Sequence, residues 1–249
     1  MNFKDHFSKR ADNYALYRPG YPATLFQHLA SLCPEKKYVW DCATGNGQAA
    51  GGLAKLFQRV VATDPSKKQI ANAVQYPKVH YCIALAEKTP IRSKSMNLVT
   101  IAQALHWLDI PKFFKEVKRV LKPGGYVAIW CYNLLHVHPR VDVLLYRYYT
   151  EIVGPYWPPE RKLTEEGYST VPFPFKEEES PTFDMEADWN VDDLIGYLRT
   201  WSSTQSFLEK NGRDPVLEIE KELRENWGSA QKKRRIRWPL SVRIGSLAD

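Results

Sequence analysis

The sequence is poor in cysteine and lacks any long apolar run. Its four cysteines (Cys33, Cys42, Cys82 and Cys131) are widely and irregularly spaced. They form no Cys-x-x-Cys pair and no Cys/His cluster, so we expect neither a disulfide framework nor a metal site. No stretch approaches the roughly 18 apolar residues that a membrane span needs. The first six residues have mixed charge, unlike a secretory signal. We therefore expect a cytoplasmic protein without a membrane partner.

Positive charge is concentrated rather than spread over the chain. The formal net charge is +7, and Lys232, Lys233, Arg234, Arg235 and Arg237 supply five positive charges within six residues. A nucleic-acid-binding surface is usually more widely basic. We therefore expect no nucleic-acid partner and interpret the run as a solvated loop before a strand.

The composition is that of a globular protein with an ample supply of aromatic residues. Hydrophobic residues make up 44% of the 249 residues and charged residues 25%, and there are 8 Trp, 14 Tyr and 10 Phe. Such a length suits one substantial domain. Several aromatics fall outside any helical or strand period. They indicate either an aromatic-lined pocket or a well-filled core.

The first part of the chain alternates between short apolar runs and amphipathic stretches, which predicts βαβ units and a parallel sheet. Ser66 is placed to cap the helix that follows the second run. A helix opening at Ile110 should end before Lys122-Pro123-Gly124-Gly125, because proline cannot continue it. The predicted strands are 38–42, 60–63, 79–83, 97–102 and 126–130.

The later part has a different pattern. Residues 154–182 are rich in Pro, Glu and aromatics and suggest an irregular lid, while 192–202 and 215–227 read as amphipathic helices. A closing strand over 238–244 should lie at or near a sheet edge because it contains Pro239. We divide the single domain into an N-terminal cover (1–35), a ligand-binding core (36–135), a cap (136–230) and a closing strand (231–249).

The strongest local feature is the turn Asp41–Gly47, between a predicted strand and a predicted helix. Glycines at this point let the backbone approach a ligand closely. Asp64 ends the next strand, 23 residues after Asp41. A carboxylate there can accept hydrogen bonds from ribose hydroxyls, or it can simply cap the following helix. Residues 48–50 are Gln-Ala-Ala, so the third glycine of a dinucleotide motif is missing, which argues against NAD.

These motifs together resemble the class I methyltransferases of the type-11 family, which use S-adenosylmethionine (SAM). The family's glycine motif corresponds to Asp41–Gly47, with Ala43 where glycine is commoner, and its acidic ribose ligand corresponds to Asp64. Its Ala-Glu-x-x-Pro motif corresponds to Ala86–Pro90. Leu85 stands where the family often has Asp, which implies that backbone groups recognise the adenine.

Within this family the chain is most similar to the branch that includes fungal trans-aconitate methyltransferase. The branch's fourth motif resembles Gln103–Trp107, its N-terminal segment resembles Tyr14–Pro22, and its late helix resembles Tyr197–Ser202. The resemblance implies a Rossmann-like α/β fold: a mostly parallel, seven-stranded sheet with helices on both faces and a small C-terminal cap. It also implies that SAM is held by Asp41, Ala43, Gly45, Gly47, Asp64, Ala86, Glu87 and Gln103.

The implied activity is methyl transfer from SAM to a small-molecule acceptor, with a carboxylic acid as one candidate. Orientation of the acceptor would then be the enzyme's main task. His106 is placed to bind the acceptor or to move a proton, or it serves as a structural histidine. Arg18 is placed to pair with an acceptor carboxylate or to anchor the N-terminal segment. The acceptor site would be walled by Tyr17, Trp107, Trp130, Tyr132 and Trp201.

Two other functions fit the same motifs. A SAM-binding sensor or partner subunit would bind the cofactor without turnover. A protein or RNA methyltransferase is a further alternative, although the Asn-Pro-Pro-Tyr type of motif is replaced after the fourth strand by Gln103-Ala104-Leu105-His106.

Overall fold

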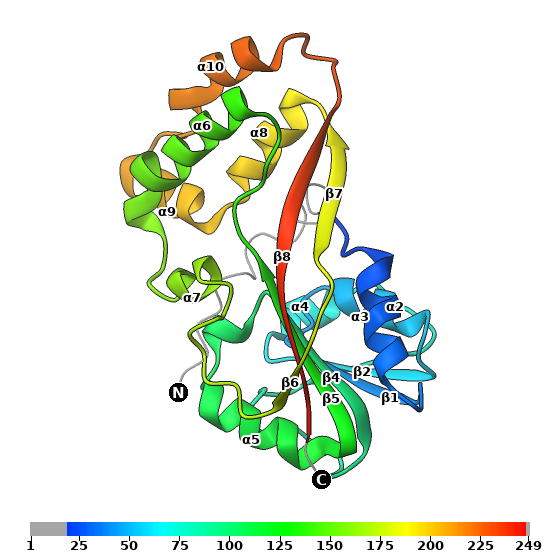
Figure 1. Ribbon diagram of the computed structural model, residues 1–249. Coiled ribbons are helices and arrows are strands. Elements are labelled where there is room, and N and C mark those ends of the chain that lie inside the picture. Colours follow the sequence, from blue (N-terminus) through cyan, green and yellow to red (C-terminus); the bar gives the residue numbers. More distant parts are fainter. Residues whose placement is uncertain (1–18, 248–249) are drawn as a thin grey trace.

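The fold is built on one mixed sheet, seen in a computed structural model that describes residues 19–247 (Figure 1). The strand order is β3-β2-β1-β4-β5-β8-β6, and β7 pairs with β8. The sheet has eight strands, where the family resemblance implies seven, and two of them, β6 and β7, were not predicted from the sequence pattern. The strands are β1 (Tyr38–Cys42), β2 (Arg59–Asp64), β3 (Val79–Ile83), β4 (Met96–Ala102), β5 (Leu121–Tyr132), β6 (Lys176–Glu178), β7 (Phe183–Trp189) and β8 (Arg234–Ser246).

The first five strands are parallel, as their sequence pattern predicts. Cys42 at the end of β1 pairs with Thr63 of β2 on one side and Ile101 of β4 on the other. The order reverses between β1 and β4, which creates a topological switch point at the carboxyl ends of these strands. Ligands of open α/β sheets bind at such a point.

Both faces of the sheet are buried, and neighbouring strand residues enter opposite cores. Val39 and Leu98 pack in the cluster under helices α2 and α3, whereas Trp40 and Val99 pack in the cluster under α5. This alternation follows the two-residue period of a strand. The helices of this part are α2 (Ala23–Leu32), α3 (Gln48–Ala54), α4 (Lys67–Ala71), α5 (Ile110–Val120) and the short turn η1 (Leu105–Trp107).

Two helix signals in the sequence are confirmed. The side chain of Ser66 caps α4 by accepting a hydrogen bond from the backbone N–H of Gln69. Helix α5 ends at Val120, just before the predicted stop, and Gly124 there has a φ of +68°. Strand β5 begins at once, at Leu121, and Gly124 lies within it, where positive φ is cheap for glycine.

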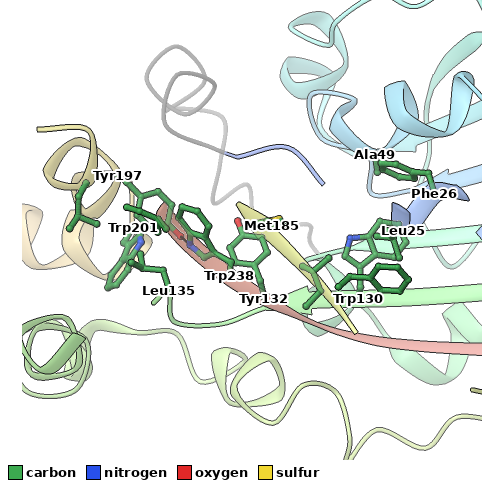
Figure 2. Close-up of a cluster of buried hydrophobic side chains, with 14 of the residues drawn as sticks. Leu25, Phe26, Ala49, Trp130, Tyr132, Leu135, Met185, Tyr197, Trp201 and Trp238 are labelled. Carbon is green, nitrogen blue, oxygen red and sulfur yellow. Dashed lines mark hydrogen bonds between the residues drawn. The ribbon is translucent and has the colours of Figure 1, made fainter. Parts of the chain in front are cut away.

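The cap consists of helices packed against a two-stranded extension of the sheet (Figure 1). Strand β8 is long enough to pair with β5 and β6 at its end and with β7 at its start. Figure 2 shows the apolar cluster continuing from Leu25, Phe26 and Trp130, past Tyr132, to Trp201 and Trp238 in the cap. The remaining elements are α6 (Pro139–Arg147), η2 (Tyr148–Ile152), η3 (Gly154–Tyr156), α7 (Arg161–Glu165), α8 (Val191–Arg199), α9 (Ser202–Asn211) and α10 (Leu217–Trp227).

The basic run is not a solvated loop. Only Lys232 and Lys233 precede the strand, because β8 begins at Arg234. Arg235 pairs with Glu186 and Asp188 of β7, and Arg237 pairs with Asp184. The arginines therefore face an acidic strand, whose alternating carboxylates oppose them across the ladder.

The segment 136–230, which we predicted to be the cap, also contributes to the core sheet. Within it, β6 pairs with β8, and Phe173 and Phe175 pack against Phe114 of α5. The irregular stretch 154–182 therefore includes one strand of the sheet. No helix in residues 19–247 is both long and apolar enough to cross a bilayer.

Candidate functional site

The glycine turn has the backbone conformation that its residues suggest. Gly45 has a φ of +56° and Gly47 of +88°, and Ala43 adopts +51° although it is not glycine. A Cβ on Gly47 would lie 2.2 Å from the hydroxyl oxygen of Tyr81, whereas one on Gly45 would have no atom of the described chain within 4 Å. The backbone at Gly45 is therefore open to a ligand.

Asp41 stabilises the glycine turn through hydrogen bonds of its side chain. Its side chain is fully buried, and its carboxylate accepts hydrogen bonds from the hydroxyls of Thr44 at 2.5 Å and Thr100 at 2.9 Å. Burial raises the pKa of Asp41 to about 6, and the two threonine hydroxyls partly offset that rise. The carboxylate of Asp41 thus links the glycine turn to β4 through these two hydrogen bonds.

Asp64 lies at the end of β2, as expected, and touches the same turn. Its carboxylate accepts hydrogen bonds from the backbone N–H of Gly45 at 3.0 Å and of Ser66 at 2.8 Å. Each carboxylate oxygen can accept more than one hydrogen bond, so these contacts do not conflict with ribose binding. The structure therefore brings Asp64 and the glycine turn together at the switch point.

The Ala86–Pro90 motif follows β3 at the same end of the sheet. Ala86 is buried, and the carboxylate of Glu87 accepts a hydrogen bond from the backbone N–H of Asp109 at 3.0 Å. Leu85 is 51% exposed. Glu87 thus ties the loop after β3 to the start of α5.

Gln103 directly follows β4 and has a φ of +53°. Its amide nitrogen donates a hydrogen bond to the carbonyl of Tyr132 at 3.1 Å, and its amide oxygen accepts one from the N–H of Tyr132 at 2.8 Å. Positive φ is uncommon for glutamine, and such conformations are often found at functional sites. This amide couples the ends of β4 and β5.

His106 lies on η1 and is almost completely buried. Its Nδ1 lies 2.8 Å from the hydroxyl of Tyr168 and 3.2 Å from that of Thr164. Burial, together with a smaller effect of the nearby charge of Arg161, lowers the pKa of His106 to about 3. The imidazole is therefore neutral near pH 7. Because a base of such low pKa accepts a proton poorly, His106 is better suited to hydrogen bonding than to proton transfer.

A pocket of about 80 Å³ opens between the ends of β4 and β5 and the cap. Five predicted site residues line it together: Gln103, His106, Trp107, Tyr132 and Trp201. The cap supplies most of the remaining wall, including Tyr149, Trp157, Arg161, Tyr197 and Thr200. An aromatic-lined pocket therefore exists where the strand mouth meets the cap.

Among the pocket residues that sequence reasoning missed, Arg161 is the charged one. It begins α7 after a Pro-Pro-Glu run, and its guanidinium lies 4.8 Å from the ring centre of Trp157. Its only sequence signal was a position within the aromatic, proline-rich stretch. Arg199, by contrast, pairs with Asp214 and Glu220 at the surface of the cap.

The other predicted wall residues are placed differently. Trp130 is fully buried in the core, edge-on to Tyr21 with ring centres 5.5 Å apart. Its indole N–H finds no hydrogen-bond partner among the described residues. Tyr17 and Arg18 lie outside the described residues. Sequence could not separate Trp130 from Tyr132, because both faces of β5 are buried.

A larger cavity, about 480 Å³, lies between α2 and α3 and is lined by residues such as Tyr21, Phe26, Gln48 and Tyr76. None of the predicted site residues within the described part of the chain lines it. In residues 19–247 there is also no group of three side chains that could hold a metal ion.

Comparison with known proteins gives one consistent result. A family model described as a methyltransferase domain matches residues 40–129. A protein of Dictyostelium discoideum, described as a proposed methyltransferase, is 35% identical over 225 residues, which cover 89% of this chain and 86% of that protein. A malonyl-[acyl-carrier protein] O-methyltransferase of Marinomonas is 33% identical over 133 residues, about half of either chain.

A solved structure is also closely similar. It comes from Anaeromyxobacter dehalogenans and is described as a proposed type II methyltransferase. It is 41% identical, covers 93% of this chain and 98% of its own, and superposes with a TM-score of 0.89. The likeness thus extends beyond the matched domain and includes the cap.

Proposed function

Because the chain belongs to the SAM-dependent class I methyltransferases of the type-11 family, we propose that it methylates a small organic acid in the pocket between sheet and cap. The observation that carries this proposal is the meeting of five predicted site residues in one pocket at the carboxyl ends of β4 and β5, the same edge of the parallel sheet that carries the glycine turn and Asp64. The similarity to the trans-aconitate methyltransferase branch remains a prediction.

The chain's residues fit the cofactor. The open backbone at Gly45 would receive SAM, Asp64 would bind its ribose, and the Ala86–Glu87 loop would lie beside its adenine. When bound, SAM supplies a methyl group whose bond to sulfur breaks as the bond to the acceptor forms, releasing S-adenosylhomocysteine. The pocket's part is to orient the acceptor and exclude water, which can contribute roughly 7–11 kcal/mol to lowering the barrier.

The state of His106 supports an acidic acceptor. An ionised carboxylate oxygen is already a nucleophile and needs no base, whereas a hydroxyl or amine must lose a proton. His106 has a pKa of about 3 and is therefore a weak base, so its better role is to orient the acceptor by hydrogen bonding. The O-methyltransferase among the relatives also supports an oxygen acceptor. The narrow pocket favours a small one.

The test begins with calorimetric titration of SAM into the purified protein, with NADH as the control ligand. We expect SAM to bind, and Asp64→Ala to weaken binding by about 1.5–3 kcal/mol, the range for a charged hydrogen-bond partner. Asp188→Ala, which removes an exposed carboxylate on β7, should leave SAM affinity unchanged. Methyl-labelled SAM is then offered with a panel of small carboxylic acids.

Transfer of label to an acid would support the proposal. A folded protein that fails to bind SAM would refute it. SAM binding without transfer to any acid, amine or alcohol would instead favour the sensor alternative.

A further inference from the structure

Arg161 is a pocket cation that meets no carboxylate among residues 19–247. Its Nε donates a hydrogen bond to the hydroxyl of Tyr149 at 3.0 Å, and its Nη2 donates one to the amide oxygen of Asn133 at 3.1 Å. Both acceptors are neutral groups. Other arginines of the cap behave differently: Arg213 and Arg199 each pair with a carboxylate.

Two contacts leave most of the guanidinium's hydrogen-bonding capacity available. The group has five N–H donors in a planar fork. Tyr149 and Asn133 take the edge formed by Nε and Nη2. The edge formed by Nη1 and Nη2 is the one that a carboxylate can engage with two parallel hydrogen bonds.

The surroundings of Arg161 hold this fork in position. Its guanidinium lies 4.8 Å from the ring centre of Trp157 and 5.6 Å from that of Tyr149. Trp201 closes the cluster, with its ring centre 5.6 Å from that of Trp157. Stacked rings fix the plane of a guanidinium and exclude part of its water, which strengthens its pairing with an anion.

One carboxylate, that of Glu165, is linked to Arg161 through the hydroxyl of Tyr149. Tyr149 receives the hydrogen bond of Arg161 and donates its own proton to Glu165. Glu165 is exposed, so water screens its charge. Within the pocket the positive charge of Arg161 therefore acts on its neighbours, and after burial it is the second cause that lowers the pKa of His106.

We propose that Arg161 is the acceptor-binding residue that selects for charge: its Nη1/Nη2 edge holds a carboxylate of the acceptor. This inference rests on the proposed function and makes it more specific. The acceptor is a small acid with two functional groups. One carboxylate is held on the cap by Arg161, and the group to be methylated lies toward Gln103 and His106 at the strand mouth.

The test compares acids with amides. Small dicarboxylic and hydroxycarboxylic acids are each paired with the amide that removes one carboxylate charge but keeps a methyl acceptor. Label transfer is measured for the wild type, Arg161→Gln, Arg161→Lys and the control Arg213→Gln. Arg213 is also a cap arginine stacked on a ring, that of Phe207, but it lies outside the pocket lining.

We expect the wild type to prefer the acid of each pair. In Arg161→Gln, the KM for the acid should rise at least tenfold, which corresponds to about 1.4 kcal/mol, while kcat changes less. A contact made equally in the ground state and the transition state has this effect. Arg161→Lys should recover part of the preference, because lysine keeps the charge but loses the fork. Arg213→Gln should behave as wild type.

Cofactor binding separates this inference from the function it rests on. SAM affinity, measured by calorimetry, should stay within about twofold of wild type in Arg161→Gln if the glycine turn is intact. The same acids are titrated in the presence of S-adenosylhomocysteine, so that binding is measured even without turnover. The inference is overturned if Arg161→Gln retains the acid preference, or if a wild type that binds SAM neither binds nor prefers any acid. Failure to bind SAM would instead refute the proposed function.

Discussion

The side-chain amide of Gln103 bonds to both backbone groups of Tyr132, donating to its carbonyl at 3.1 Å and accepting from its N–H at 2.8 Å. Gln103 directly follows β4 and Tyr132 ends the adjacent parallel strand β5, and both residues line the pocket between the sheet and the cap. One side chain therefore holds the two strand ends at the spacing that the pocket requires.

Gln103→Glu should destabilise the protein by about 1–3 kcal/mol. A carboxylate cannot donate to the carbonyl of Tyr132, so this hydrogen bond is lost and a negatively charged oxygen faces the carbonyl oxygen instead. Urea unfolding measures the change, with Gln231→Glu as a control because Gln231 is an exposed amide before β8. Equal stability of the two variants would show that the Gln103 contacts contribute nothing.

Ala43→Gly should stabilise the protein by up to about 1 kcal/mol. Ala43 has a φ of +51°, a conformation that costs an L-residue energy but not glycine. The control is Ala50→Gly, in the buried interior of α3, which should be destabilising. Chemical denaturation of both variants checks the sign. A loss of stability in Ala43→Gly comparable to that of the control would contradict this account.

Gly45→Ala and Gly47→Ala should differ although both residues have positive φ. Each variant suffers backbone strain of about 1–2 kcal/mol. Only the Cβ at position 47 would also collide with Tyr81, whose hydroxyl donates to the carbonyl of Val74 at 2.7 Å. Gly47→Ala should therefore lose more stability in urea, and Tyr81→Phe should recover part of the excess. No recovery in the double variant would rule out the collision with the hydroxyl.

His106 should make the protein less stable as the pH falls from about 6.5 toward 3. Burial lowers its folded-state pKa to about 3 from the usual 6.5, so in this window the unfolded chain binds a proton that the folded chain does not. The resulting slope approaches about 1.4 kcal/mol per pH unit. Asp41 acts in the opposite direction below pH 6, because its folded-state pKa is raised to about 6.

Comparison of His106→Gln with the wild type isolates the contribution of His106 to the pH dependence of stability. Urea unfolding of His106→Gln across pH 4 to 8 should show a shallower loss of stability on the acid side, while Asp41 titrates alike in both proteins. Parallel curves would mean that His106 takes up its proton at the same pH in the folded and unfolded chains, and would contradict the lowered pKa.

Sequence determined the parts of this protein that depend on local pattern. Residues close together along the chain determine the five parallel strands, the glycine turn, the helix cap formed by Ser66 and the position of Asp64. Each of them is set by apolar runs, by φ preferences or by hydrogen bonds within a few residues. For the same reason the family resemblance could be stated from short motifs in order.

Tertiary structure alone decided which distant residues share the pocket. Arg161 reaches the strand mouth because α7 packs beside η1, and β7 pairs with β8 although about 45 residues separate them in sequence. Trp130 and Tyr132 lie on one face of one strand, yet only the second reaches the pocket. Which of the two residues reaches the pocket depends on how deeply each is packed and on where the cap contacts the sheet. The periodicity of the sequence contains neither kind of information, because on a strand buried on both faces every position is apolar.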